Sequence, residues 1–201
     1  FDDAALANPN TALFAYDWSY TSYALGVNYV IDDGLAVFGN YSKGARAGFG
    51  DRLADGGYIV AGQAQPNAVV NELSMLEAGV KYQDKNYGIF ATLFSVTTDD
   101  ANAESARGLD NPARIREFES TGLEIEATAN IDAFSFFGGL TWTDAEIVGA
   151  NDPSVIGNTP RRQPDLLYTG TGTYTFEDGH NIGISFFGRS DSFVGDDNSS
   201  D

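Results

Sequence analysis

The sequence contains no cysteine and one histidine, and its 11 basic residues are outnumbered by 29 acidic ones. The lack of cysteine excludes a disulfide scaffold, a cysteine-ligated zinc site and a cysteine nucleophile. The formal net charge of -18 argues against nucleic acid as a partner, because phosphates are bound mainly by lysine and arginine. No stretch approaches the roughly 18 consecutive apolar residues of a transmembrane helix. We expect no catalytic site, no metal site and no cofactor.

Neither end of the chain has the sequence of a natural terminus. The chain begins with Phe1, Asp2 and Asp3, which lack the basic start and apolar core of a signal peptide. Residues 195–201 are rich in Asp, Asn and Ser and resemble the middle of a loop. We therefore expect a fragment of a longer chain.

Alternation of apolar and polar residues is the dominant pattern. The 14 Phe, 10 Tyr and 23 Gly favour β structure, and a period of two persists in eight runs where no helical period does. In one run, Leu123 and Ile125 share a face while Glu124 and Glu126 share the other. We predict strands at about 19–30, 34–43, 72–82, 87–98, 117–129, 133–146, 164–176 and 180–193.

Tight turns and long segments alternate between the predicted strands. The tight turns carry Asp, Asn and Gly in hairpin positions and lie at 31–34, 83–86, 130–132 and 177–179. The long segments lie at 44–71, 99–116 and 147–163. Strict alternation puts all tight turns at one end of the sheet, as in an outer-membrane barrel with short periplasmic turns and long extracellular loops.

Aromatic residues lie next to the tight turns, on the more apolar face of the strands. This predicted level comprises Tyr29, Tyr82, Tyr87, Phe134 and Tyr174. Rings at one level, facing outward, are typical of an interfacial aromatic girdle, although rings also cap the core of any β fold. Candidates for a second girdle at the opposite end are Tyr41, Phe94, Trp142 and Phe193.

Charge occupies the opposite faces of the predicted strands, at Glu77, Lys81, Glu124 and Glu126. Unpaired charge is costly in a sandwich core but acceptable in the wet interior of a barrel, where polar residues are the rule. We therefore predict an all-β fold, an antiparallel up-and-down transmembrane β-barrel section of about eight strands, with these four residues facing the lumen. The predicted organisation is an extracellular loop end at 1–18, the barrel strands at 19–193 and the start of the next loop at 194–201.

Four segments resemble a known family in their order and spacing. Residues 41–47, Tyr-Ser-Lys-Gly-Ala-Arg-Ala, are similar to a Tyr-Ser-x-Gly-Phe-Arg-Ala-Pro strand end. Residues 77–82 are similar to a Glu-x-Gly-x-Lys-Tyr core, and residues 122–126 to a Gly-x-Glu-x-Glu strand. Pro160 and Pro164 resemble the proline-marked start of the next strand. Over most of its length the chain thus resembles the C-terminal half of the barrel of TonB-dependent outer-membrane receptors.

The resemblance implies a transport function and a larger machine. Such receptors have about 22 barrel strands, an N-terminal plug and a segment that contacts the TonB complex, and this chain contains neither of the last two. They lie in the outer membrane of Gram-negative bacteria, among lipid and lipopolysaccharide, and import scarce ligands such as ferric siderophores. The resemblance therefore implies a fragment of an active-transport receptor, not an enzyme. Ala45 and Gly48 replace the usual Phe and Pro, so the ligand contacts of the following loop cannot be copied from the family.

Two other classes remain open. The chain could be a complete eight-stranded outer-membrane barrel with a structural or adhesin role, because eight strands can close around their own side chains. It could also be a soluble β-sandwich, for example a carbohydrate-binding module. The fragment-like ends and the motifs oppose the first class, and the inward glutamates oppose the second.

Most arginines lie in or beside the long segments, and guanidinium is the preferred partner of carboxylate and phosphate. The candidate ligand-binding residues at the outer mouth are Arg46, Arg52, Arg114, Arg116, Arg161 and Arg162. Acidic residues share these segments, however, and the near-zero net charge there favours local ion pairs over ligand contact.

Two further patterns receive ordinary interpretations. His180 follows a turn and has no catalytic partners nearby in the sequence, so we expect a surface histidine. Asp196, Asn198 and Ser200 alternate like calcium-loop ligands, but Asp201 stands where a glycine is required. A solvated acidic loop explains this run better.

Overall fold

The computed structural model describes residues 19–47, 59–60, 63–64, 70–102, 114–150 and 152–200. Within these residues an 8-stranded antiparallel sheet has the order β1-β2-β5-β6-β7-β8-β9-β10. Its strands are β1 (Tyr23–Asp32), β2 (Leu35–Ala47), β5 (Val70–Gln83), β6 (Tyr87–Asn102), β7 (Arg114–Ile131), β8 (Phe134–Ala150), β9 (Leu166–Thr175) and β10 (Asn181–Arg189). The remaining elements are the short paired strands β3 (Ile59–Val60) and β4 (Gln63–Ala64), and the 3₁₀ helix η4 (Pro153–Val155).

All strands of the sheet correspond to predicted runs, but several are longer than expected. The extra residues lie at the loop end, where β2 continues to Ala47, β6 to Asn102 and β8 to Ala150. Charged residues such as Asp99 interrupt the apolar pattern there, so the sequence indicated loop where the backbone is still paired. A register shift between Glu117 and Phe118 adds to the irregularity.

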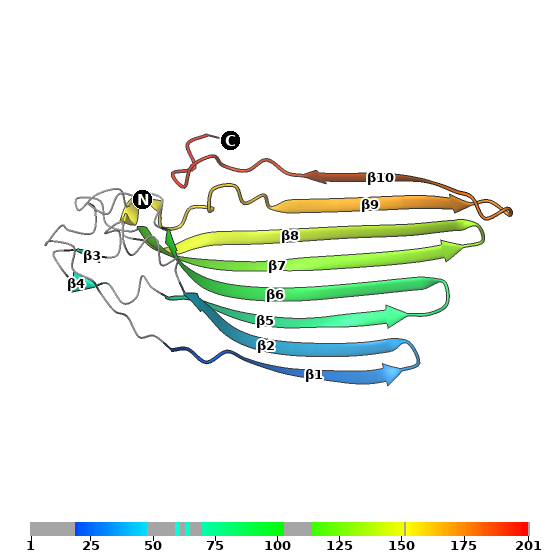
Figure 1. The fold of residues 1–201 in the computed structure, drawn as a ribbon, viewed down its shortest axis with the longest axis horizontal. Helices are drawn as coiled ribbons and strands as arrows, with labels where there is room; N and C mark the ends of the chain where they lie inside the picture. Colours follow the sequence, from blue (N-terminus) through cyan, green and yellow to red (C-terminus); the bar gives the residue numbers. More distant parts are fainter. Residues whose placement is uncertain are drawn as a thin grey trace, which may run out of the picture.

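The connections are sorted by length, as predicted. In Figure 1 the tight turns that join β1 to β2, β5 to β6, β7 to β8 and β9 to β10 all lie at one end of the sheet, and the strand ends between which the longer connections run lie at the other. Gly34 and Gly179 have φ values of 85° and 89°, a region that favours glycine, which explains their place in two of these turns.

One carboxylate organises the turn between β5 and β6. Asp84 accepts hydrogen bonds from the backbone N–H groups of Asn86 and Tyr87, both at 2.7 Å, and from the Tyr82 hydroxyl at 2.9 Å. These donors stabilise the ionised form, so the pKa of Asp84 is lowered from its ordinary value. The tight turn predicted at 83–86 is thus stabilised by its one aspartate.

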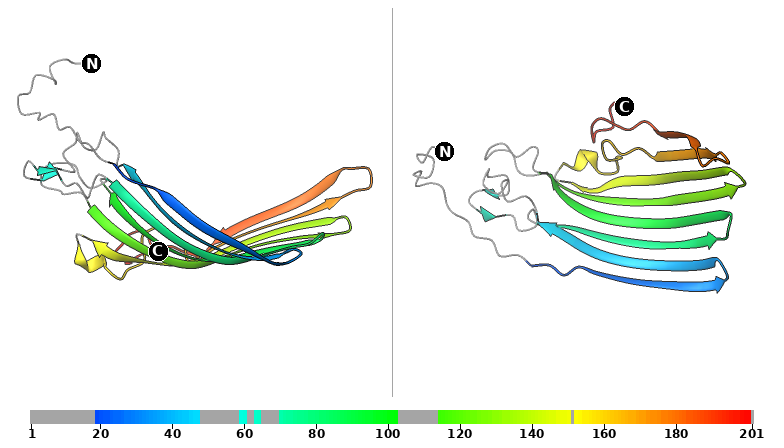
Figure 2. Two further views of the ribbon diagram at one scale, coloured as in Figure 1. Left: turned by 90° about the horizontal axis from the view of Figure 1, so that it is seen from below. Right: turned by 45° about the vertical axis from the view of Figure 1, so that its right-hand side comes forward.

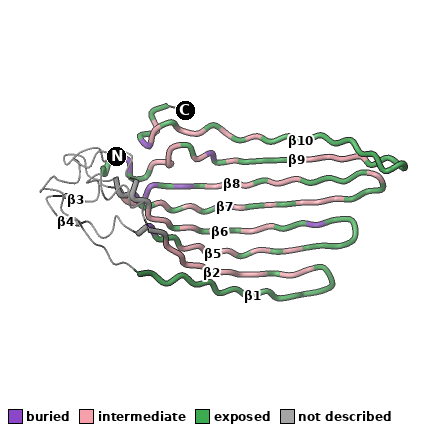
Figure 3. Tube along the Cα trace, viewed as in Figure 1, coloured by how far each residue is buried: buried purple, intermediate pink, exposed green. Residues whose placement is uncertain are grey.

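The sheet is a single curved layer with almost no interior of its own (Figure 2). Among the described residues the buried hydrophobic side chains are Ala145, Ile147 and Val155, and most of the buried chain lies near the loop end (Figure 3). Large apolar side chains are exposed instead, including Leu25 at 76% and Ile184 at 75%. A sheet of this kind needs an external apolar phase for its exposed face.

Most of the exposed apolar side chains share one face of the sheet, whereas a smaller set, Phe90, Phe137, Leu167 and Phe187, lies on the other face. Registers align Leu93 with Leu123 and Leu123 with Trp142 on the first face. We call it the apolar band; on β8 it runs from Phe134 to Trp142, about nine residues, which matches the length of a tilted membrane-crossing strand. Beyond the band, towards the loops, the same face becomes polar at Asp144.

The opposite, polar face carries the charged residues that were predicted to point away from the apolar side. Registers place Glu77 beside Asn40 and Phe94, and Glu126 beside Phe90 and Gly139. Lys81 and Glu124 lie on the same face by alternation along β5 and β7. The predicted separation of these charged residues from the apolar band is therefore confirmed for β5 and β7.

The aromatic level at the tight turns lies on the apolar face, as predicted. Tyr29, Tyr82, Tyr87 and Phe134 are all exposed there. The Phe134 and Tyr174 ring centroids lie 4.9 Å apart, and those of Tyr174 and Phe176 lie 4.8 Å apart. Adjacent rings thus pack against each other along this end of the sheet.

The predicted second aromatic level is only half right. Tyr41 and Trp142 lie on the apolar face, and the Tyr41 ring centroid is 6.0 Å from that of Tyr23. Phe94, however, lies on the polar face opposite Gly122, and Phe193 follows the end of β10. The prediction was wrong for Phe94 because this residue directly follows Leu93 of the apolar face, so alternation turns its ring to the other face, over Gly122.

Contacts between an aromatic ring and a glycine, which we call ring-on-glycine contacts, recur between neighbouring strands. The register partners are Phe38 and Gly79, Phe94 and Gly122, Phe186 and Gly170, and Tyr168 and Gly188. In each pair a side chain built on the glycine would meet the partner's ring. The glycines in these strands therefore hold rings flat against the sheet.

Candidate ligand site at the loop end of the sheet

Two segments fold against each other and against β7 and β8 at the loop end. We call them the loop pair (residues 152–165 and 190–200). The backbone N–H of Ile147 donates to the Asn158 carbonyl at 2.9 Å, and the N–H of Gly157 donates back to the Ile147 carbonyl at 2.9 Å. Ile147 is 0% exposed and Val155, on η4, is 7% exposed. The loop pair thus completes a small core that the sheet alone lacks.

A buried ion pair joins the loop pair to the sheet. The guanidinium of Arg116, on β7, contacts the carboxylate of Asp196, and the two residues are only 6% and 7% exposed. The same carboxylate accepts a hydrogen bond from the Arg161 backbone N–H at 2.8 Å, and the Asp196 carbonyl accepts one from the Asn158 amide at 2.9 Å. These bonds offset the cost of burying both charges.

An asparagine joins the two segments directly. Asn198 accepts a hydrogen bond from the Thr159 N–H at 2.9 Å and donates one to the Thr159 carbonyl at 2.8 Å. Its φ of 52° lies in the left-handed region, which Asn tolerates better than most residues. The Arg162 N–H also donates to the Phe193 carbonyl at 2.8 Å. The two segments are therefore fixed to each other through their backbones.

The residues that alternate like calcium ligands, Asp196, Asn198 and Ser200, belong to the loop pair. Asp196 is buried rather than solvated, so the predicted solvated loop is wrong at this position. Its neighbour Asp197 is exposed and accepts hydrogen bonds from the Ser199 hydroxyl and N–H, which lower the pKa of the Asp197 carboxyl. No group of three possible metal-ligating side chains lies within the described residues.

The structure separates the predicted ligand-binding arginines. Arg116 is engaged by Asp196, whereas Arg162 is exposed to solvent. Arg46 and Arg114 lie at the loop ends of β2 and β7, and Arg52 lies outside the described residues. Arg161 and Arg162 belong to the loop pair, and the Arg161 backbone N–H donates to Asp196 of the buried ion pair. Ligand binding by any of the six stays a prediction.

One arginine was missed. Arg189 ends β10, at the border of the loop pair, where the predicted strand continued to residue 193. It is exposed and its register partner is Leu167. The alternation of β10 could have identified it, because Arg189 follows Ser185 and Phe187 on the polar face near the loop end.

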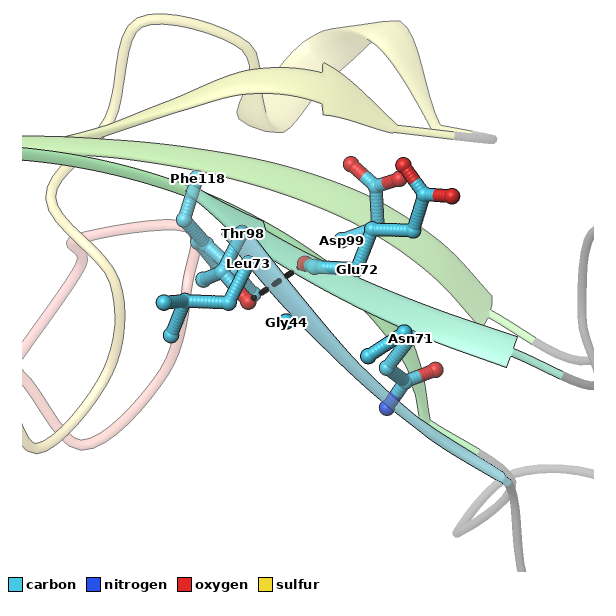
Figure 4. A pocket seen from close by; sticks show the side chains of 8 residues that line it. Gly44, Asn71, Glu72, Leu73, Thr98, Asp99 and Phe118 are labelled. Atoms are coloured by element: carbon cyan, nitrogen blue, oxygen red, sulfur yellow. Dashed lines mark hydrogen bonds between the residues drawn. The ribbon is translucent and has the colours of Figure 1, made fainter. Parts of the chain in front are cut away.

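A hollow of about 510 Å³, which we call the acidic hollow, lies at the loop ends of β2, β5, β6 and β7 (Figure 4). Leu73, Thr98 and Phe118 form its apolar side, and Glu72 and Asp99 extend together on another side. Glu72 forms an ion pair of 2.9 Å with Lys43, and the Thr98 hydroxyl donates to the Glu72 carbonyl at 3.2 Å. Its carboxylates do not favour an anionic ligand.

The four charged residues predicted for the lumen lie on the polar face, away from the loop pair. The Asn40 amide donates to the Glu77 carboxylate at 2.9 Å, and the Lys81 ammonium lies 4.5 Å from the centre of the Phe38 ring. Glu124 and Glu126 are exposed on this face. These residues line a polar wall rather than a closed site.

The one histidine of the sequence lies in the turn between β9 and β10. His180 is exposed in its turn, with its ring nitrogen 3.9 Å from Asp178. This agrees with the expected surface histidine.

No helix within the described ranges is long and apolar enough to cross a membrane.

Comparisons with known proteins agree on one family. The family model described as "TonB dependent receptor-like, beta-barrel" matches residues 2–201. The ferrichrome outer membrane transporter/phage receptor of Escherichia coli (strain K12) is 28% identical over 163 residues, covering 80% of this chain and 20% of the relative. The chain therefore spans about a fifth of that relative's length.

Solved structures show the same fold. BauA, the ferric preacinetobactin receptor from Acinetobacter baumannii, superposes with a TM-score of 0.68 at 15% identity, covering 87% of this chain and 26% of that one. The unliganded ferric citrate transporter FecA gives a TM-score of 0.67 at 17% identity, covering 88% and 26%. The predicted all-β barrel section, its family and its outer-membrane location are confirmed.

Proposed function

The chain belongs to the TonB-dependent receptor β-barrel family, and from that premise we propose that it is part of the wall of an outer-membrane receptor that imports a scarce ligand. The observation that carries the proposal is the two-faced sheet with all long loops at one end. The apolar band contacts lipid, and the polar face lines the lumen of a barrel of about 22 strands. The loop end then forms the outer mouth.

The open edges of the sheet favour a large barrel over a small one. β1 and β10 lie at opposite ends of the strand order, and no register pairs them within the described residues. A complete eight-stranded barrel would join these two strands. The remaining strands, the plug and the segment that contacts the TonB complex then belong to the rest of a longer receptor.

The ligand enters at the loop pair and leaves along the polar face. The described relatives are named as ferrichrome, ferric preacinetobactin and ferric citrate receptors or transporters, which supports a ferric siderophore or a similar iron chelate as the ligand. Glu77, Lys81, Glu124 and Glu126 face the plug and the translocation path. Lipopolysaccharide surrounds the outer part of the wall. No residue of the chain is assigned a catalytic role.

Iron accumulation in cells tests this function. The full-length receptor is expressed in a Gram-negative host without other siderophore receptors, with and without TonB, and supplied with radiolabelled ferric chelates from an iron-limited culture of the source bacterium. We expect accumulation that requires both the receptor and TonB. Entry of small solutes that is proportional to concentration and independent of TonB would instead identify a passive channel.

A further inference from the structure

A hollow with exposed arginines lies between the loop pair and the end of β10. We call it the arginine hollow; its volume is about 490 Å³ and its lining residues are Arg162, Arg189, Ser190, Asp191, Ser192, Phe193 and Val194. It is separate from the acidic hollow of Figure 4, which lies at the loop ends of β2, β5, β6 and β7. None of the predicted site residues except Arg162 belongs to it.

The backbone around the arginine hollow is fixed from both sides. At the end of β10 the Ser190 N–H donates to the Leu166 carbonyl at 2.9 Å, and the Leu166 N–H donates to the Ser190 hydroxyl at 3.2 Å. Arg162 has a φ of 61° and donates its N–H to the Phe193 carbonyl at 2.8 Å. Both arginines therefore extend from backbones that are already in place, which lowers the entropy cost of binding.

No group in the described part of the chain pairs with the guanidinium of Arg162 or Arg189. Within the described residues neither Arg162 nor Arg189 forms a side-chain hydrogen bond or an ion pair, whereas Arg116 is neutralised by Asp196. Asp191 is the one carboxylate among the lining residues, so the hollow carries an excess of positive charge. Two unpaired guanidiniums beside hydroxyl groups are suited to carboxylate or phosphate oxygens.

The other side of the hollow is apolar. Phe193 lines it, and Val194 is 61% exposed. A small inorganic anion would leave this surface unused, whereas an organic anion would contact the arginines with its oxygens and the apolar side with its carbon skeleton.

We propose that the arginine hollow is a binding site for a polycarboxylate, free or as its iron chelate. Arg162 and Arg189 bind its carboxylates, and Asp191 lowers the affinity by repulsion. The assignment of this ligand as transported cargo rests on the proposed function, but binding itself does not.

Protection from chemical modification tests the site without knowledge of the natural ligand. The full-length receptor is treated with phenylglyoxal, which modifies accessible arginines, and the modified peptides are quantified by mass spectrometry. Citrate is the probe, and its uncharged triethyl ester is the control. We expect citrate to slow the modification of Arg162 and Arg189 together and the ester to have no effect.

Charge variants sharpen the test. Asp191→Asn removes the repulsion, so half-maximal protection of Arg162 should require about threefold less citrate. Arg189→Ala removes half of the carboxylate contact and should raise that concentration at least about tenfold. Lys85→Ala, which removes one cation from a tight turn at the far end of the sheet, is the matched control and should leave it unchanged.

Two results would overturn the proposal. The first is modification of both arginines at the same rate with and without citrate. The second is arginines that do not react even without citrate, because other parts of the receptor would then cover the hollow. Citrate protection without TonB-dependent iron accumulation would leave the site standing and reject the transport function. TonB-dependent iron accumulation without citrate protection would support the transport function and reject the arginine hollow as a binding site.

Discussion

The middle of the sheet and its loop end are stabilised in opposite ways. In the apolar band, large side chains such as Leu25 and Phe186 remain exposed, and the strands are held by backbone pairing and ring-on-glycine contacts. At the loop end, a buried ion pair and Ile147 form a small core made of the chain itself. The middle of the sheet depends on its surroundings for stability, whereas the loop end is stabilised by contacts within the chain.

This difference assigns a physical role to each region. A wall in lipid gains little from an internal core, because the lipid already covers its apolar face. Loops in water must satisfy their backbone polar groups and exclude solvent by themselves, or remain disordered. The loop pair does so through Asp196 and Asn198, and it can therefore hold the arginine hollow in one shape.

The largest effect should come from breaking the buried ion pair. Asp196→Ala leaves the Arg116 guanidinium buried without a counter-charge, which costs about 3–5 kcal/mol. Amide hydrogen exchange of residues 152–165 and 190–200 in the full-length receptor should accelerate, while exchange in the middle of β7 stays slow. Asp197→Ala removes an exposed neighbouring carboxylate and serves as the control. Unchanged exchange in the Asp196 variant would show that the loop pair does not depend on this contact.

The next effect should come from placing charge in the apolar band. Ile125 lies on the apolar face beside Leu140, and Ile125→Arg should destabilise the receptor in phospholipid vesicles by about 2–4 kcal/mol in urea unfolding. Thr121→Arg, on the same face of β7 but paired with Asp144 beyond the band, should have little effect. Equal losses for the two variants would contradict the placement of the band along the strand.

The smallest effect should come from lateral packing. A side chain at Gly122 would meet the Phe94 ring and the Trp142 carbonyl, so Gly122→Ala should cost about 1–3 kcal/mol in the same urea assay. A side chain at Gly138 would meet only the Thr169 carbonyl oxygen, at 4.0 Å, so Gly138→Ala should be neutral or slightly stabilising. If both variants unfold alike, the ring-on-glycine contacts contribute nothing.

The strands could be predicted from the sequence because the patterns that identify them lie within short stretches of the chain. The alternation of Leu123 and Ile125 with Glu124 and Glu126 reports two environments within four consecutive residues, and turn glycines such as Gly34 mark where the chain reverses. Registers between neighbouring strands then follow from the tight turns. Phe94 was assigned to the wrong face although alternation within β6 already places it opposite to its neighbour Leu93.

The loop end could not be predicted because its contacts join distant parts of the chain. Nothing near Arg116 in the sequence indicates Asp196 as its partner, and acidic residues closer to it offered a simpler pairing. Asp196 and Asn198 have the composition of a solvated loop, and only their burial against Thr159 and Arg161 distinguishes them. Arg189 was overlooked because strand residues were not considered as ligand contacts.

The separation of tight turns from long connections has a consequence for chain entropy. Each tight turn closes a hairpin locally, whereas the connections between β2 and β5, β6 and β7, and β8 and β9 must close over longer stretches. The entropy cost of closing a flexible loop grows only with the logarithm of its length, and each doubling costs about 0.6 kcal/mol. Insertions at the outer mouth are therefore thermodynamically cheap, while the registers of the wall stay fixed. The loop end of the sheet can therefore change in length and sequence while the pairing of the strands is kept.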